Sequence, residues 1–153
     1  MKYLAAPALF LALATSASAE AGPMTITRSG SHPVQRTPAA NCTGDVRFIQ
    51  LAPVSSPHRS SSTSVTFARG ARTAWHSHPG GQTLVVTSGT GWIQAWGEKR
   101  QEIRVGDTIW TPPGVKHWHG ATATAGMTHL TIQGIVDGRV VDWNEKVSDE
   151  QYK

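Results

Sequence analysis

The feature that most constrains the fold is a series of short β-type runs separated by Gly, Pro and polar turns. Branched and aromatic residues, which favour strands, recur every few positions after Thr63, and no amphipathic helix of ten residues interrupts them. The runs expected as strands are 63–69, 83–87, 92–96, 102–105, 108–111 and 128–135. Only 148–151 has the pattern of a capped helical turn. The pattern predicts an all-β domain, a sandwich or small barrel, whose closure leaves a cavity of small-ligand size.

The length of 153 residues suits one such domain, preceded by segments of different composition. Lys2 precedes an apolar run over 3–14, and Ala17-Ser18-Ala19 has the small-x-small pattern of a signal-peptidase site. We expect a signal peptide over 1–19, cleaved after Ala19, and export to the periplasm; a buried N-terminal helix is the alternative. Residues 20–62 are rich in Ser, Pro and Thr and predict an irregular arm with loops and one strand-like piece over 46–51. The β-barrel is expected over 63–153.

Charge and cysteine content narrow the range of partners. Lys and Arg number 14 against 10 Asp and Glu, a net charge of +4, and the basic residues are scattered without a cluster. We therefore expect no nucleic-acid partner, and no membrane association once the signal peptide is removed. Cys42 is the single cysteine, so no internal disulfide can form. We expect it to be buried and inert; an adventitious intermolecular disulfide is the alternative.

Five histidines within a short stretch carry the strongest chemical signal. His76 and His78 are two residues apart, so on a strand both rings point to the same face. His117 and His119 repeat that spacing directly after a Pro/Gly turn, and His129 begins an apolar run. Any one of them alone would be taken as a surface or hydrogen-bonded core residue. Together they predict metal ligation by His76, His78 and His117, and a pocket role without ligation for His119 and His129.

The spacing of these residues resembles a known family. The first stretch reads Gly70-x5-His76-x-His78-x3-Gln82-x6-Gly89, which resembles the first cupin motif with Gln in the acidic position. The second reads Gly106-x5-Pro112-x-Gly114-x2-His117 and resembles the second motif, with Ala121 where an asparagine often closes it. The resemblance implies a single-domain cupin: a small β-barrel, or double-stranded β-helix of jelly-roll type.

A narrower resemblance covers most of residues 63–152. The segments ARTAWHSHPGGQTLVVTSGTGW, PPGVKHWHGA, MTHLTIQ and VVDWNEKVSDEQY are similar to the bacterial manganese-dependent, cupin-type hydroxynitrile lyases, or (R)-mandelonitrile lyase-like cupins. That resemblance implies metal binding by His76, His78, Gln82 and His117. It places His119 and His129 beside the substrate as the catalytic pair. It implies a pocket lined by Thr63, Val65, Thr73 and Gln133. Because cupins commonly dimerise, it also implies a homodimer or higher homo-oligomer.

A neutral Gln82 in the ligand position suits Lewis-acid chemistry. Three neutral imidazoles and an amide leave a divalent ion its full charge, which favours polarisation of an oxygen-bearing small molecule over metal redox cycling. The expected function is reversible cleavage of cyanohydrins to aldehyde and cyanide, with His119 or His129 as general base. The resemblance implies Mn²⁺ as the ion, while the ligand types alone fit Fe²⁺, Ni²⁺ and Zn²⁺ as well.

Two other functions remain open at this stage. One is a metal-dependent dioxygenase, isomerase or decarboxylase that acts on a small oxygenated molecule at the same site. The other is a non-catalytic binder of sugars or small acids. An aromatic substrate would need aromatic walls, and four tryptophans are candidates either for these walls or for packing of the barrel. They are Trp75, Trp92, Trp110 and Trp118.

Overall fold

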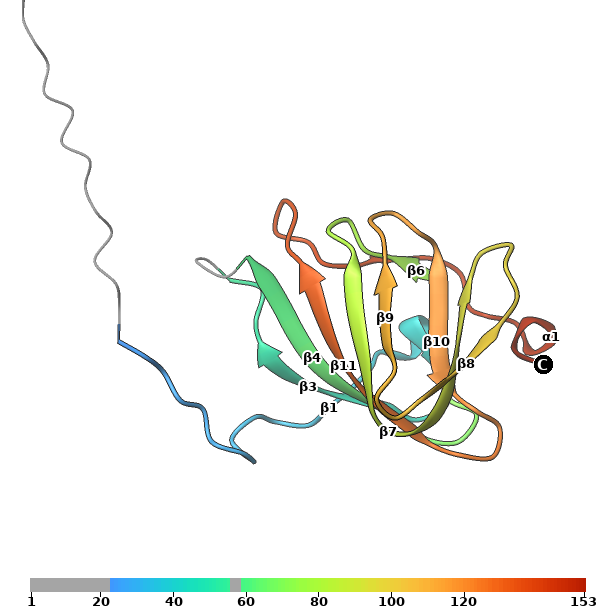
Figure 1. The fold of residues 1–153 in the computed structure, drawn as a ribbon, viewed down its shortest axis with the longest axis horizontal. Coiled ribbons are helices and arrows are strands. Elements are labelled where there is room, and N and C mark those ends of the chain that lie inside the picture. The colour runs from blue at the N-terminus through green and yellow to red at the C-terminus, as the bar shows by residue number, and fades with distance from the viewer. Residues whose placement is uncertain (1–22, 56–58) are drawn as a thin grey trace, which may run out of the picture.

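The protein is an antiparallel sheet that curls into a half-barrel (Figure 1). The prediction of an all-β domain is therefore confirmed. The computed structural model describes residues 23–55 and 59–153; the signal-peptide prediction over 1–19 lies outside them. The strands are β1 (Gln35–Arg36), β2 (Cys42–Thr43), β3 (Val46–Ala52), β4 (Ser60–Phe67), β5 (Arg72–Thr73), β6 (His76–Ser77), β7 (Gln82–Ala95), β8 (Gln101–Arg104), β9 (Thr108–Thr111), β10 (His117–Ala121), β11 (Met127–Gly134) and β12 (Asp142–Trp143). A 3-10 turn spans Ala39–Asn41, and helix α1 spans Asp149–Tyr152.

The strands pair in the order β1-β3-β4-β11-β7-β10-β5-β2, with β6, β8, β9 and β12 attached to this path. Residues 35–52, from the stretch expected as an arm, therefore contribute β1, β2 and β3 to the sheet. Residues 23–34 extend away from the barrel, on the side opposite α1 (Figure 1). Strand β12, near the C-terminus, pairs with β6, which carries His76. Strand β2 pairs with β5, which in turn pairs with the histidine-bearing strand β10.

Strand β7 links the two halves of the barrel. Its first half pairs with β9 and β11, and its second half with β8 and β10. We expected two strands here, 83–87 and 92–96, but the structure has one strand of 14 residues that bends near Gly89. Gly89 has φ of 73°, and a Cβ on it would lie 2.0 Å from the Gly126 carbonyl oxygen, so only glycine allows this bend. The glycine marked a bend within a strand, where the sequence suggested a break between two strands.

Strand β4 begins earlier than the sequence pattern predicted. Residues up to 62 were expected as an irregular arm with loops, yet Ser60–Ser62 form the start of β4, where all three pair with β11 and Ser62 also pairs with β3. Ser61 is buried, and its hydroxyl donates to the Ala52 carbonyl and accepts from Gln50. Serine here is satisfied by hydrogen bonds that cross between strands, which no local pattern reveals.

Two hydrophobic clusters hold the barrel together. The larger fills its interior with Cys42, Val46, Phe67, Ala71, Leu84, Val86, Ile93, Ile103, Ala121 and Met127. Cys42 is buried as expected. The smaller cluster docks the C-terminal segment and consists of Trp75, Trp118, Val147 and Tyr152. The helical turn at the end carries the expected capping box, with Ser148 accepting from the Gln151 amide, and the Tyr152 hydroxyl donates to the Ala121 carbonyl.

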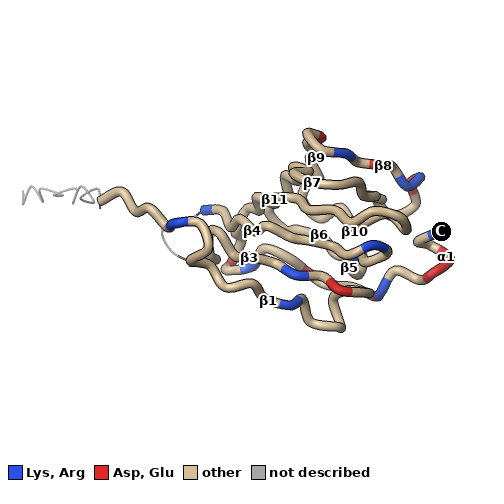
Figure 2. The backbone as a smooth tube through the Cα atoms, turned by 90° about the horizontal axis from the view of Figure 1, so that it is seen from below, with Lys and Arg blue, Asp and Glu red and all other residues tan. Residues whose placement is uncertain are grey.

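More than half of the described strands carry no charged side chain. Strands β2, β4, β6, β7, β9, β10 and β11 contain no Lys, Arg, Asp or Glu, and Figure 2 shows them in tan. The charged residues lie on loops and on the other strands, and several pair with one another, as Lys116 does with Glu145 and Arg72 with Asp149. Within 23–55 and 59–153, no helix is long and apolar enough to cross a membrane.

Candidate metal centre

The five predicted histidines lie together inside the barrel, each at most 3% exposed. His76 and His117 are Cα partners in the β6–β10 ladder, and their ring centroids are 4.3 Å apart. His78 follows β6, with its ring 5.0 Å from that of His76. His119 lies two residues along β10 from His117, and His129 lies on the facing strand β11. Strand spacing thus brings the residues of each pair to one face, as the sequence predicted.

The two Pro/Gly turns of the motifs meet at one backbone atom. The carbonyl of His78 accepts hydrogen bonds from the amides of Gly81 and Gly114, at 3.2 and 3.0 Å. Both glycines have positive φ, 74° and 76°, which the turns require. Each turn leads directly into a residue of the site, Gln82 at the start of β7 and His117 near the start of β10. This shared carbonyl explains why the motifs, over thirty residues apart, place their side chains at one point.

Three of the imidazoles are oriented by main-chain carbonyls. The Nδ1 atom of His76 lies 2.9 Å from the Ala74 carbonyl, that of His78 lies 2.6 Å from Val140, and that of His117 lies 3.0 Å from Val115. Since a carbonyl only accepts, each Nδ1 carries the proton and each Nε2 presents a free lone pair. This is the arrangement in which histidines ligate metals through Nε2.

The histidines are neutral at physiological pH because they are buried. Desolvation is the main cause that lowers the pKa of each ring from its ordinary value of 6.5: to about 4 for His78, to about 3 for His129, well below 6.5 for His76 and His119, and to a lesser degree for His117. The neighbouring rings lower the pKa of His76 and His119 further, because two imidazolium charges would repel. Neutral imidazole is the form that binds a metal.

A contact between His117 and Gln82 indicates where a cation fits. The free Nε2 lone pair of His117 faces the amide oxygen of Gln82 at 3.2 Å, so two acceptors oppose each other. Rotating the Gln82 side-chain amide by a half turn would bring its NH2 group to His117 and make a normal hydrogen bond, but it would satisfy only these two atoms. A cation between the two atoms would satisfy them too. Nε2 of His78 is buried without a partner among the described residues, as a further ligand would be, and the ring centroid of His78 lies 5.4 Å from that of His117. The donor set therefore fits a divalent metal.

His119 belongs to a second possible grouping. Ring nitrogens of His76, His117 and His119 lie within 4.8 Å of one another, close enough for one ion. His119 differs from the other rings because its Nδ1 lies 3.1 Å from Nε2 of His129, another imidazole, while its own Nε2 has no partner in the described chain. Its backbone amide donates to the Thr73 hydroxyl at 3.2 Å. The geometry alone allows His119 either as a ligand or as a free base beside the ion.

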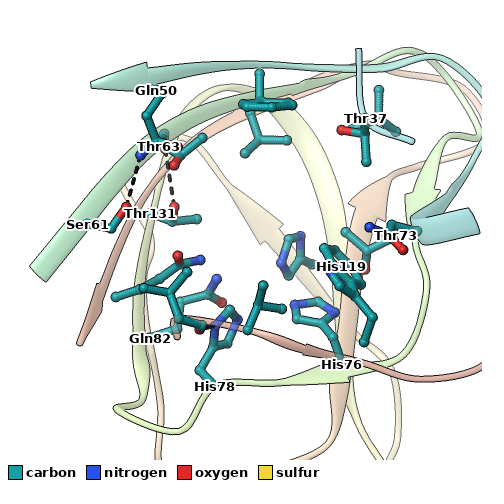
Figure 3. Close-up of a pocket in the computed structure, with 18 of the residues that line it drawn as sticks. Thr37, Gln50, Ser61, Thr63, Thr73, His76, His78, Gln82, His119 and Thr131 are labelled. Carbon is teal, nitrogen blue, oxygen red and sulfur yellow. Dashed lines mark hydrogen bonds between the residues drawn. The ribbon is translucent and has the colours of Figure 1, made fainter. Parts of the chain in front are cut away.

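A cavity of about 260 Å³ opens onto His76, His78, Gln82 and His119, whereas His117 does not line it. Figure 3 shows His76, His78, Gln82 and His119 on one side of it and Gln50, Ser61, Thr63 and Thr131 on another. The four residues expected in the pocket all line the cavity: Thr63, Val65, Thr73 and Gln133. His129 lies behind His119 and does not line it. Among the described residues no Asp or Glu lines the cavity, so a bound cation would keep its charge.

The structure adds pocket residues that the sequence patterns did not indicate. Val140, Val141 and Trp143 come from the C-terminal segment, and Phe48 comes from β3. None of the four tryptophans considered as walls lines the cavity. Trp75 and Trp118 are buried in the smaller cluster, Trp92 packs against it, and Trp110 is exposed on the outside. The sequence signal for Trp143 was its presence in the segment VVDWNEKVSDEQY, without any indication of where that segment lies.

Burial of neutral histidines predicts acid sensitivity of the metal-free protein. In the unfolded chain histidines titrate near 6.5, whereas folded His78 stays neutral down to about 4 and His129 down to about 3. Below pH 6.5 the unfolded state therefore binds more protons, and the free energy of unfolding falls as pH falls, by about 2 kcal/mol for each such ring at pH 5. Urea unfolding of chelator-treated protein at pH 7 and pH 5 measures this. The change should persist in a His32→Gln control, and equal midpoints at both pH values would contradict it.

Comparison with known proteins agrees with the fold and the site. Residues 63–132 match the model of the cupin domain family. The (R)-mandelonitrile lyase of Granulicella tundricola is 52% identical over 130 residues, which cover 85% of this chain and 99% of that protein. A cupin-like protein from Thermotoga maritima superimposes with a TM-score of 0.74 at 36% identity, over 76% of this chain and 89% of that one. A polyketide cyclase from Streptomyces resistomycificus shares only the fold, with a TM-score of 0.68 at 15% identity over 84% and 90% of the two chains. The chain belongs to the cupin family and is a homologue of (R)-mandelonitrile lyase with a buried three-histidine metal-binding site.

Proposed function

We propose that this protein is a metal-dependent hydroxynitrile lyase, which cleaves cyanohydrins to an aldehyde and cyanide and runs the reaction in reverse. The observation that carries the proposal is the cluster of three carbonyl-oriented imidazoles, His76, His78 and His117, two of which line a cavity that has no Asp or Glu among its described lining residues. The 52% identity to (R)-mandelonitrile lyase supports the same reaction. We assign His76, His78, Gln82 and His117 as the ligands. A divalent ion bound there would act as a Lewis acid on the substrate's oxygen.

His119 is placed to move the proton. His119 lines the cavity, and its Nε2 atom is buried without a partner among the described residues, so this atom is available to take the proton of a cyanohydrin hydroxyl oriented toward it. The electrons of the O–H bond form the carbonyl, the C–C bond breaks, and its electron pair leaves with cyanide. The proton then returns from His119 to give hydrogen cyanide. Burial keeps the ring neutral beforehand and excludes water from the transfer.

His129 sets the tautomer of His119. When Nδ1 of His119 carries the proton and donates to Nε2 of His129, Nε2 of His119 is free to accept. If the proton between the rings belongs to His129 instead, Nε2 of His119 carries its own proton and acts as a donor, the state that protonation of cyanide requires. His129 is therefore a positioning residue, and His119 is the one that touches substrate.

Cyanide release tests this proposal directly. Protein reconstituted with Mn²⁺ is expected to release cyanide from mandelonitrile faster than the same concentration of free Mn²⁺, and to form one enantiomer in excess from benzaldehyde and cyanide. An activity no greater than that of the free ion, with a racemic product, would remove the proposal. Metal analysis of protein purified from its native compartment, in place of the reconstituted form, would test manganese as the resident ion.

We also propose export and self-association. The pattern of the first 19 residues supports a cleaved signal peptide and a periplasmic location. The outward faces of β3, β11 and β9 support a homo-oligomer, because they expose the large apolar side chains of Leu51, Ile132 and Trp110. N-terminal sequencing of the exported protein tests whether the signal peptide is cleaved after Ala19. Light scattering of the mature protein gives its oligomeric state.

A further inference from the structure

We infer that Trp143 is the aromatic wall of the pocket and selects substrates that carry a flat ring. Trp143 is the last residue of β12 and the Cα partner of His76 in the β6–β12 ladder. Its indole ring lies 4.9 Å from the His76 imidazole, centroid to centroid, at an interplanar angle of 42°. It lines the cavity and remains 39% exposed. A large aromatic surface is thus left uncovered beside the groups that would act on the substrate.

The other five tryptophans of the chain have different partners. Trp75 and Trp118 are buried, and Trp92 packs against Tyr152 and lies under the Arg100 guanidinium at 3.5 Å. Trp96 packs against Trp75 and under Lys116, and Trp110 is exposed without bordering the cavity. Of the six, Trp143 alone both lines the cavity and has free aromatic surface. A large apolar side chain left open in a concave site is typical of a ligand contact.

The backbone around Trp143 is held firmly. Asn144 donates to the Trp75 carbonyl at 2.8 Å, and Trp75 donates to the Glu145 carbonyl at 2.9 Å. Side-chain pairs lie on both flanks, Arg139 with Asp142 and Lys116 with Glu145. The indole is therefore presented from a fixed backbone, so a ring that packs against it does not have to order a loop first.

Trp143 would therefore favour aromatic over aliphatic cyanohydrins, an inference that rests on the proposed function. A cyanohydrin whose hydroxyl points to His119 and whose ring packs on Trp143 gains an aromatic contact that a short aliphatic cyanohydrin lacks. Such a pair contributes more than the buried area alone. We expect the contact to be worth about tenfold in affinity and in kcat/KM.

Trp143→Leu tests the inference. With the variant, kcat/KM for mandelonitrile is expected to fall about tenfold, chiefly through KM, while that for acetone cyanohydrin stays within about twofold. Trp110→Leu is the matched control, because Trp110 is 58% exposed outside the cavity, and it should change neither value. Trp143→Phe keeps an aromatic face and should recover most of the discrimination, a result that a purely structural role would not give.

A binding measurement separates this inference from the proposed reaction. Benzyl alcohol and isobutanol are titrated calorimetrically into Mn²⁺-loaded wild-type and variant proteins, with the metal content of each determined. We expect Trp143→Leu to lower the affinity for benzyl alcohol about tenfold and to leave the affinity for isobutanol unchanged. If benzyl alcohol binds through Trp143 but no cyanohydrin is cleaved, the proposed reaction fails and the inference stands. The inference is overturned if Trp143→Leu and Trp143→Phe lower the affinities for both alcohols equally. It is also overturned if the wild-type protein binds benzyl alcohol no more tightly than isobutanol.

Discussion

Replacing His78 with alanine is expected to empty the metal centre and to lower cyanohydrin cleavage by about a thousandfold. The Nε2 atom of His78 is buried without a partner in the described chain, and its Nδ1 is held by the Val140 carbonyl, so the ring is oriented as a ligand. Without it a three-donor set remains. Loss of Lewis-acid polarisation removes several kcal/mol of transition-state stabilisation, and about 1.4 kcal/mol corresponds to a factor of ten in rate.

Elemental analysis together with cyanide release measures both parts of this prediction. His32→Ala, which removes a histidine outside the barrel site, is the control and should keep metal and activity. The outcome also decides between the two groupings of histidines. If the His78→Ala protein still holds one full equivalent of metal, then His76, His117 and His119, whose nitrogens lie within 4.8 Å of one another, form the ligand set instead.

Replacing His119 with phenylalanine is expected to lower kcat by about a hundredfold to ten-thousandfold while the protein keeps its metal. General-base catalysis by a positioned side chain contributes an effect of this size. Phenylalanine keeps a flat aromatic ring, somewhat larger than imidazole, at a position that is 3% exposed and already packs at a right angle against Phe67, with centroids 5.8 Å apart, so the barrel should remain folded. The substitution removes both ring nitrogens and with them the capacity to accept a proton.

His117→Phe is the matched control for this variant, since it makes the same change two residues earlier on β10. The His117→Phe protein should lose both its bound metal and its activity, because the substitution removes the Nε2 atom that faces Gln82. Metal content, kcat and the near-ultraviolet circular dichroism of both variants separate the outcomes. A His119→Phe protein that lacks metal would assign His119 as a ligand, and one with full activity would exclude it as the base.

Much of the barrel could be predicted because its strands are marked locally. Runs of Val, Ile and Thr bounded by glycine and proline identified β8, β9 and β11 to within a residue or two. The two-residue strands β5, β6 and β12 have no such mark, since each exists only through pairing with a distant partner. The serine-rich start of β4 was missed for the same reason: its hydrogen bonds to Gln50 and Ala52 are tertiary contacts.

In the site, too, the features set by local spacing could be predicted, and those set by tertiary contacts could not. His76, His78 and His117 could be predicted as partners because spacing along a strand determines which face a side chain occupies. The relative depth of His119 and His129 could not, because it depends on how β10 and β11 lie across the barrel. Nor could the Val140 carbonyl or the Trp143 indole, which reach the histidines from more than sixty residues along the chain.

The attachment of the C-terminal segment to the histidines has a consequence for biosynthesis. All five histidines leave the ribosome before residues 140–143, which supply the carbonyl that orients His78 and the strand that pairs with β6. A nascent chain therefore holds an incomplete centre, and the ion can be captured tightly only after residues 140–143 have emerged and folded against β6. For a chain that is translocated unfolded, the ion would be drawn from the compartment where folding is completed, and the supply of metals there would decide which one the protein contains.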